Sequence, residues 1–230
     1  MGGRTVRRWR EWAFAAGLIG LGVGVLVGAL VETVWASPWA PIAATGLVWI
    51  GMLVPTILVF RRSRPVGLLR FRPLDLLWGL GLAVALRIVQ GSVAQSVSGE
   101  SSLPSITTID GATADGWWVE AILGAVVIAP AVEEFFFRGL VLVTVFTILR
   151  RPLGHLAAGI IAGMVSTGLF VLAHSMTGDV SIDAVIATTL LGFTCSAVVL
   201  LTGRIWGAVL IHAVYNASFV VLALMGTVLA

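Results

Sequence analysis

Charge is scarce in this chain of 230 residues, of which only 11% are Asp, Glu, Lys or Arg. In an ordinary soluble domain about a quarter of the residues are charged. With 59% hydrophobic residues and a mean hydropathy of +1.06, the chain carries more apolar surface than a soluble domain of its size can bury. These values exclude a soluble globular fold and indicate a protein whose natural solvent is the lipid bilayer.

Cysteine and lysine are nearly or wholly absent. The one cysteine, Cys195, cannot form an internal disulfide, and it has no motif partner that would suggest a thiol protease. All 14 basic residues are arginines, and the sequence pI of about 10.4 is of the kind found in nucleic-acid-binding proteins. However, the arginines gather in short segments beside apolar runs, which is the positive-inside pattern of membrane proteins. We therefore expect no nucleic-acid partner.

Long apolar runs are abundant, and each is close to the roughly 20 residues that a helix needs to cross a bilayer. The sequence predicts an all-α, polytopic transmembrane helix bundle of about seven spans. We divide it into residues 1–116, with three N-terminal spans and a polar loop, and residues 117–230, with a bundle of four spans. The predicted spans are 12–35, 40–60, 75–97, 117–150, 155–174, 184–201 and 205–230.

The arginines predict the orientation of these spans. If the N-terminus is cytoplasmic and each span crosses once, the cytoplasmic segments hold every arginine except Arg87 and Arg138, and the opposite loops hold none. Arg87 lies within a span, where it either reaches the surface or pairs with a buried acid. We expect a multi-pass integral membrane protein with a cytoplasmic N-terminus, and its compactness favours a prokaryotic cell membrane.

A stripe of small residues runs along the first span, where Gly20, Gly24 and Gly28 are spaced by four residues. Such a stripe lets a second membrane helix approach closely. We interpret it as a packing feature.

Ionisable residues inside a span are costly and usually functional. The fourth span contains Glu133, Glu134 and Arg138. Glu134 and Arg138 are four residues apart, so they can meet on one helix face and neutralise each other. Glu133 points about 100° away and is left without a local partner. A carboxylate in such a place suits a general base, although all three residues could instead serve helix packing.

Two later spans carry histidines with the same spacing. Phe170 and His174 share one face of the fifth span, so the phenyl ring can pack against the imidazole. His212 and Asn216 share one face of the seventh span. Each pair alone is typical of contacts between helices. Together with Glu133 they supply a carboxylate base, two imidazoles and an amide, which can activate water and stabilise an oxyanion.

These motifs, Glu-Glu-x-x-x-Arg, Phe-x-x-x-His and His-x-x-x-Asn on successive apolar segments, resemble the CPBP family over residues 117–220. This family comprises CAAX proteases and bacteriocin-processing enzymes and is also called the Abi family. The resemblance implies an intramembrane endopeptidase. It also implies that Glu133 and His174 activate water, that His212 and Asn216 hold the oxyanion, and that the supporting residues are Glu134, Arg138 and Phe170.

The sequence leaves open whether the site uses a metal cofactor. The chain lacks His-Glu-x-x-His, in which two zinc ligands and a base share one helix, and the glutamate-dependent mechanism needs no metal. We prefer the metal-free interpretation. The alternative is a zinc ion bound by Glu133, His174 and His212. The expected partners are the bilayer and a membrane-associated or lipidated peptide substrate.

Two other functions are compatible with the sequence. One is a non-catalytic membrane scaffold or bacteriocin-immunity protein. The other is a proton-coupled transporter, since buried ionisable residues also mark ion paths, although no inverted repeat is evident.

Helix lengths add a geometric expectation. At 1.5 Å per residue, Glu133 and His212 reach a common depth only if the hairpin of the fourth and fifth spans projects beyond the membrane by about three turns. We expect the resulting site to open toward the cytoplasm.

Overall fold

A computed structural model describes residues 9–99, 103–106, 108–109, 112–113, 117–176 and 181–229. Helices dominate these residues, with one two-residue antiparallel ladder between β1 and β2. In chain order the elements are α1 (Glu11–Val34), α2 (Ala40–Arg62), α3 (Leu74–Ser98), β1 (Thr108–Ile109), β2 (Ala112–Thr113), η2 (Val119–Ile128), α4 (Ala129–Glu134), η3 (Phe135–Leu142), α5 (Val143–Ser175), α6 (Ile182–Thr202) and α7 (Trp206–Leu229). The expected all-α bundle is confirmed.

In the described part of the chain, six helices are long and apolar enough to cross a membrane. One of them, Val119–Ser175, joins η2, α4, η3 and α5 into a stretch of 57 residues. This stretch reverses direction at Gly154, whose φ of 77° and ψ of 172° suit only glycine. It therefore provides two passes, and the six helices account for the seven predicted spans. The predicted spans 117–150 and 155–174 left residues 151–154 for this turn, and Gly154 lies within that range.

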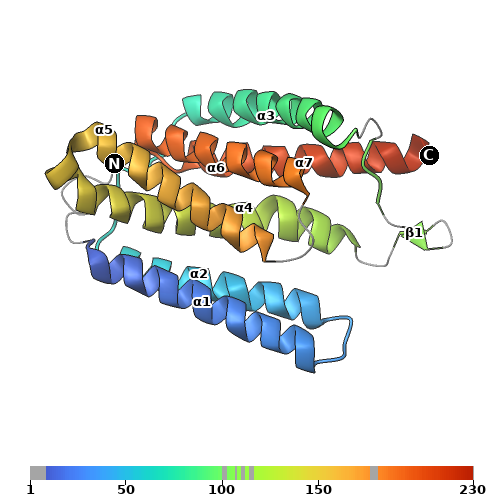
Figure 1. Ribbon diagram of the computed structural model, residues 1–230, viewed down its shortest axis with the longest axis horizontal. Coiled ribbons are helices and arrows are strands. Elements are labelled where there is room, and N and C mark those ends of the chain that lie inside the picture. The colour runs from blue at the N-terminus through green and yellow to red at the C-terminus, as the bar shows by residue number, and fades with distance from the viewer. Residues whose placement is uncertain are drawn as a thin grey trace.

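Two contacts show that the limbs of this hairpin lie side by side and antiparallel. The rings of Phe146 and His155, on either side of the reversal, are 6.1 Å apart. Further along, the hydroxyl of Ser166 donates to the carbonyl of Phe137 at 2.9 Å. In Figure 1 the reversal extends beyond the left-hand ends of α6 and α7, and its projection beyond the membrane stays a prediction.

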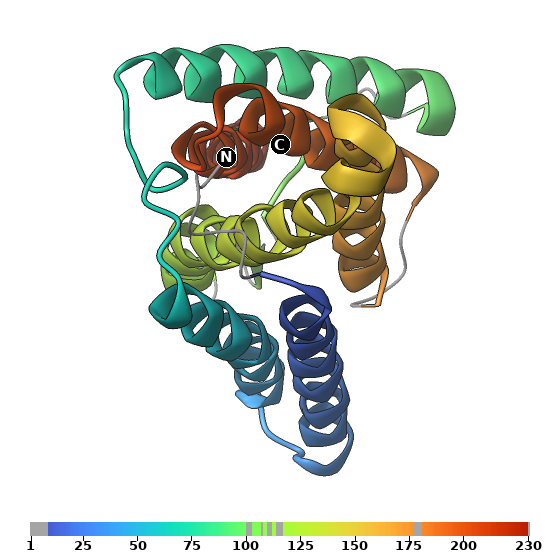
Figure 2. The same ribbon diagram turned by 90° about the vertical axis from the view of Figure 1, so that its left-hand side faces the viewer.

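The helices are stacked in layers. Figure 2 shows α1 and α2 as a hairpin on one side and α3 on the opposite side, with the other helices between them. The helix α3 packs against α7, and α5 packs against α6. Several fully buried large side chains, among them Phe136, Phe137 and Leu140, belong to η3, which contacts both α1 and α2. The hairpin that carries the motif residues is thus the centre of the bundle.

The predicted glycine stripe brings α1 against α2. A Cβ atom on Gly20 would lie 2.4 Å from the carbonyl oxygen of Gly51, and one on Gly24 would lie 2.9 Å from that of Leu47. No side chain fits at these distances, so the glycines permit the close approach of the two backbones. The interpretation of the stripe as a packing feature is confirmed.

The arginine-rich end of the bundle is held by a buried ion pair. Arg204, between α6 and α7, donates from Nη2 and Nε to Asp75 Oδ1 at 2.7 and 3.0 Å. Asp75 lies at the start of α3 and is fully buried. This pair fixes the start of α3 against the α6–α7 turn.

Within the described ranges, Arg87 neither reaches the surface nor pairs with a buried acid, which were the two predicted alternatives. Its guanidinium donates to the hydroxyl of Ser218 at 2.8 Å, to the side-chain oxygen of Gln90 and to the carbonyl of Tyr215. Its Cζ also lies 4.0 Å from the centre of the Tyr215 ring. Neutral acceptors and a ring face therefore solvate this charge between α3 and α7, with no carboxylate partner among the described residues.

Candidate active site

The charged residues of the fourth span lie where the helix changes its winding. The α-helical segment α4 ends at Glu134 and is flanked by the wider π-helical segments η2 and η3. Turns of this kind are rare and occur frequently at functional sites. Glu133 and Glu134 are the last two residues of α4, and Arg138 lies on η3.

Glu134 and Arg138 form the ion pair that their spacing predicted. Arg138 Nη1 lies 3.0 Å from Glu134 Oε1, and both side chains are fully buried. Arg138 Nη2 also donates to the carbonyl of Gly192 on α6 at 3.1 Å. The same Glu134 oxygen accepts from His212 Nδ1 at 3.0 Å. The Glu134–Arg138 pair therefore joins three helices, because Glu134 accepts from α7 and Arg138 donates to α6.

Glu133 faces both histidines. Its Oε2 atom lies 3.6 Å from His174 Nε2 and 3.9 Å from His212 Nε2. This oxygen is buried and has no hydrogen-bond partner among the described residues. The three residues come from α4, α5 and α7, and the structure brings them to a common depth, as the length argument required.

Phe170 separates the imidazoles from Arg138. Its ring centre is 4.3 Å from that of His174 and 5.7 Å from that of His212. On another side, the Cζ of Arg138 lies 4.4 Å from the ring centre. Phe170 is fully buried, and its predicted contact with His174 is present. The ring thus restricts the positions that both imidazoles can take.

The hydrogen bonds of the two Nδ1 atoms determine the protonation of the Nε2 atoms that point toward Glu133. His174 Nδ1 is 2.9 Å from the carbonyl oxygen of Phe170, which can only accept, so Nδ1 carries a hydrogen. His212 Nδ1 similarly donates to the Glu134 carboxylate. In each neutral ring, Nε2 then presents a lone pair toward Glu133. Each histidine is held in one tautomer by its surroundings.

Glu133, His174 and His212 are also the residue types that bind zinc, and metal-bound histidines commonly donate their other N–H in this way. Nevertheless, within the described ranges no group of three or more His, Cys, Asp or Glu side chains is arranged to hold a metal ion. The donor types fit the zinc alternative, whereas the arrangement of the side chains does not.

Among the described residues, the Asn216 side chain forms no hydrogen bond with His174 or His212. Its Nδ2 donates at 2.8 Å to the carbonyl of Ala125 on η2. This bond joins α7 to the first part of the hairpin, one of the roles that the sequence left open. Its oxyanion role stays a prediction. Cys195 is buried, and its sulfur lies 3.7 Å from the carbonyl oxygen of Ala208.

A cavity of about 450 Å³ leads to Glu133 and His174. Glu133 and His174 line it, with side-chain exposures of 12% and 40%. Its other walls come from the second half of α1, including Gly28 and Glu32, and the first half of α2, including Pro41. These walls are at the end of α1 and α2 away from the arginines. The expectation that the site opens toward the arginine-rich side was therefore wrong.

The sequence missed these walls because α1 and α2 carry no motif. Their one signal was the glycine stripe, and it was correctly attributed to packing. The cavity arises because α1 and α2 contact the hairpin at η3 and diverge from it further on, which Figure 1 shows at the right-hand side.

Comparison with known proteins identifies part of the chain. Residues 115–218 match the family model described as Type II CAAX prenyl endopeptidase Rce1-like. The match runs from η2 to about the middle of α7 and includes Glu133, His174, His212 and Asn216. Searches of curated proteins and of solved structures returned no match.

Proposed function

Residues 115–218 form a domain of the Rce1-like type II CAAX prenyl endopeptidase family, and from this premise we propose that the protein is a glutamate-dependent intramembrane endopeptidase. Membership of this family suggests a protease, which implies a peptide substrate. In the proposed reaction, Glu133 and His174 activate water, and His212 and Asn216 stabilise the oxyanion.

The approach of Glu133 Oε2 to two imidazole nitrogens carries this proposal. Separations of 3.6 and 3.9 Å are longer than direct hydrogen bonds, and polar atoms this far apart are commonly joined by one water molecule. A water held there would give a proton to Glu133 as its oxygen attacks the carbonyl carbon. General-base catalysis of this kind contributes about 10²- to 10⁴-fold to a rate.

His174 is suited to orient the water. Its Nδ1–H is bonded to the Phe170 carbonyl, so its Nε2 can accept one hydrogen of the water while Glu133 accepts the other. Its ring is packed against Phe170 on one side and exposed to the cavity on the other. A substrate in the cavity would therefore meet His174 beside the attacking oxygen.

The oxyanion would be held by His212 and Asn216. His212 can donate from Nε2 only when both ring nitrogens are protonated, and the Glu134 carboxylate at 3.0 Å supplies a counter-charge for that form. A primary amide has two N–H donors, so the bond from Asn216 to Ala125 leaves a second one for the oxyanion. Two such donors in a site of low dielectric stabilise a developing negative charge.

The proposed substrate is a membrane-associated or lipidated peptide. The cavity beside Glu133 has walls of mainly apolar side chains from α1 and α2, among them Val25, Val48 and Met52. Apolar walls suit a substrate segment that arrives from the bilayer. The carboxylate of Glu32, at the α1 wall, adds a negative charge to this otherwise apolar surface.

Peptide cleavage by the purified full chain in detergent tests the proposal. We would compare wild type, Glu133→Gln and Glu120→Gln on a panel of lipidated and plain peptides, with and without a chelator. Glu120 is an exposed glutamate on η2 and serves as the matched control. We expect Glu133→Gln to lose at least about 10²-fold in activity and Glu120→Gln to retain it.

The outcomes distinguish the hypotheses. Activity that survives the chelator supports the metal-free mechanism, and activity that zinc restores after chelation supports the zinc alternative. Unchanged cleavage by Glu133→Gln would contradict the role of Glu133. Failure to cleave any peptide would favour a scaffold, an immunity protein or a transporter.

A further inference from the structure

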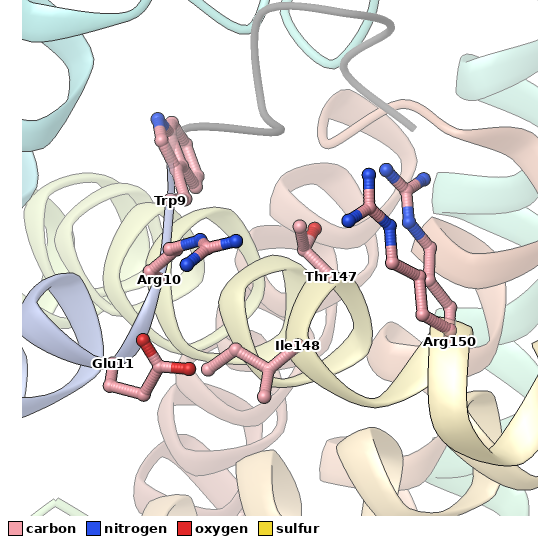
Figure 3. Close-up of a pocket in the computed structure, with 7 residues that line it drawn as sticks. Trp9, Arg10, Glu11, Thr147, Ile148 and Arg150 are labelled. Carbon is pink, nitrogen blue, oxygen red and sulfur yellow. The ribbon is translucent and has the colours of Figure 1, made fainter.

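A second, smaller pocket lies at the arginine-rich end, between the start of α1 and the tip of the α5 hairpin. Its volume is about 130 Å³, and it shares no lining residue with the cavity at Glu133. Figure 3 shows its lining, which comprises Trp9, Arg10, Glu11, Thr147, Ile148, Arg150 and Arg151. We propose that this pocket binds a phosphate group, carried by an anionic lipid headgroup or free in solution. The proposal does not depend on the peptidase function.

The charges at the pocket favour an anion. The lining contains three arginines and one glutamate, which leaves an excess of two positive charges. None of these arginines forms an ion pair with a described residue, unlike Arg138 and Arg204, which have buried carboxylate partners. The eight residues before Trp9 contain no Asp or Glu that could neutralise the pocket. An anion from outside the chain would neutralise this excess charge.

The donor groups suit phosphate in particular. A guanidinium is a planar fork that binds two oxygens of a phosphate at once. In Figure 3, Arg10 and Arg150 reach in from opposite sides of Thr147, whose hydroxyl can donate a further hydrogen bond. The 24-residue helix α1 begins at Glu11, so the positive end of its dipole lies at the pocket wall. Arginines from two segments thus converge on one small space.

The size of the pocket limits the ligand. Its volume of about 130 Å³ is less than a third of the 450 Å³ of the cavity at Glu133, which suits a compact anion better than a peptide segment. For a lipid, the phosphate would occupy the pocket and the rest of the molecule would lie outside it.

The position of the pocket favours a lipid as the source. The exposed Trp12 lies on the first turn of α1 beside the pocket, and tryptophan is typical of the membrane interface, at the level of the lipid headgroups. The positive-inside pattern places this end in the cytoplasm, where the leaflet carries anionic lipids. A lipid phosphate would therefore meet the pocket at its natural depth.

Binding would join two parts of the molecule. Trp9, Arg10 and Glu11 belong to the start of α1, whereas Thr147 to Arg151 belong to the hairpin that carries Glu133. A phosphate between them would clamp α1 to the hairpin. Since α1 also forms a wall of the cavity at Glu133, this clamp would hold that wall in place.

Native mass spectrometry of the purified full chain in detergent tests the proposal. We would titrate wild type, Arg150→Gln/Arg151→Gln, Arg10→Gln and the control Arg70→Gln/Arg72→Gln with phosphatidic acid, with phosphatidylcholine and with inorganic phosphate. The control removes two exposed arginines from the same end of the molecule, outside the pocket. Wild type should bind one phosphatidic acid in preference to phosphatidylcholine.

We expect both pocket variants to bind phosphatidic acid at least roughly tenfold more weakly, and the control variant to bind it like wild type. Inorganic phosphate that binds as tightly as the lipid, with the same dependence on the arginines, would identify the free anion as the ligand. Equal binding by wild type and both pocket variants would overturn the proposal. So would an equal loss in the control, which would indicate only general surface charge.

Discussion

The buried carboxylate of Glu134 allows the sharpest test of how this site is held together. Its Oε1 accepts from Arg138 Nη1 and from His212 Nδ1, both at 3.0 Å, in a fully buried position. Glu134→Gln keeps a neutral acceptor oxygen of the same shape. Glu134→Leu removes the acceptor and leaves the guanidinium and the imidazole without a carboxylate.

The magnitudes follow from these contacts. A hydrogen bond to a charged group contributes about 1.5–3 kcal/mol and a neutral one about 0.5–1.5 kcal/mol, so two weakened bonds predict a loss of about 2–3 kcal/mol for Glu134→Gln. Removing one partner of a buried ion pair costs about 3–5 kcal/mol, which is the prediction for Glu134→Leu. The double variant Glu134→Leu/Arg138→Met should cost clearly less than the sum of its single variants, because no unpaired charge is left in the pair.

Reversible unfolding in mixed detergent micelles, followed by circular dichroism, measures these differences. Glu120→Gln again serves as the control for the loss of a glutamate charge on the same hairpin. The reasoning would be refuted if Glu134→Leu cost less than about 1 kcal/mol, or if the costs of Glu134→Leu and Arg138→Met simply added in the double variant.

Further predictions concern other parts of the bundle and are measured by thermal unfolding in detergent. Gly20→Ala should lower the Tm, because its Cβ would lie 2.4 Å from the Gly51 carbonyl, whereas Gly22→Ala faces open space and should not; equal effects would contradict the close approach of α1 and α2. Gly154→Ala should cost about 1–3 kcal/mol, since alanine is strained at a φ of 77°, and an unchanged Tm would argue against the reversal at this residue. Asp75→Ala should cost about 3–5 kcal/mol, because it leaves Arg204 largely buried without its carboxylate; a Tm equal to that of Arg70→Gln would refute this role.

Much of the site was predictable because its contacts within a helix follow the helical repeat. Residues four apart share a face, so the Glu134–Arg138 pair and the Phe170–His174 contact could be read from spacing alone. The same repeat left Glu133 pointing away from Arg138. Its partners lie 41 and 79 residues further along the chain, on α5 and α7. The family motifs suggested that these residues meet, but no local rule gives their distances.

The cavity that leads to Glu133 and His174 could not be predicted from the sequence. The cavity depends on the angle at which α1 and α2 leave the hairpin, and this angle results from packing between helices that have no motif in common. Arg87 is a similar case. Its neutral partners on α7 are more than 120 residues away along the chain. The sequence around Arg87 does not indicate which acceptors its guanidinium will contact.

The sequence by itself determined that the protein is a multi-pass helix bundle, where its spans begin and end to within a few residues, and which residues belong to the family's motifs. The bilayer is the reason, because each span must be long, apolar and internally hydrogen-bonded. These requirements are met by consecutive residues, so they can be recognised in a short stretch of sequence. Only the tertiary structure decided that Glu133 faces two imidazoles, that Asn216 bonds to η2 and that the cavity lies at the end away from the arginines. These features depend on how helices far apart in the chain pack together, and packing between helices leaves no local pattern in the sequence.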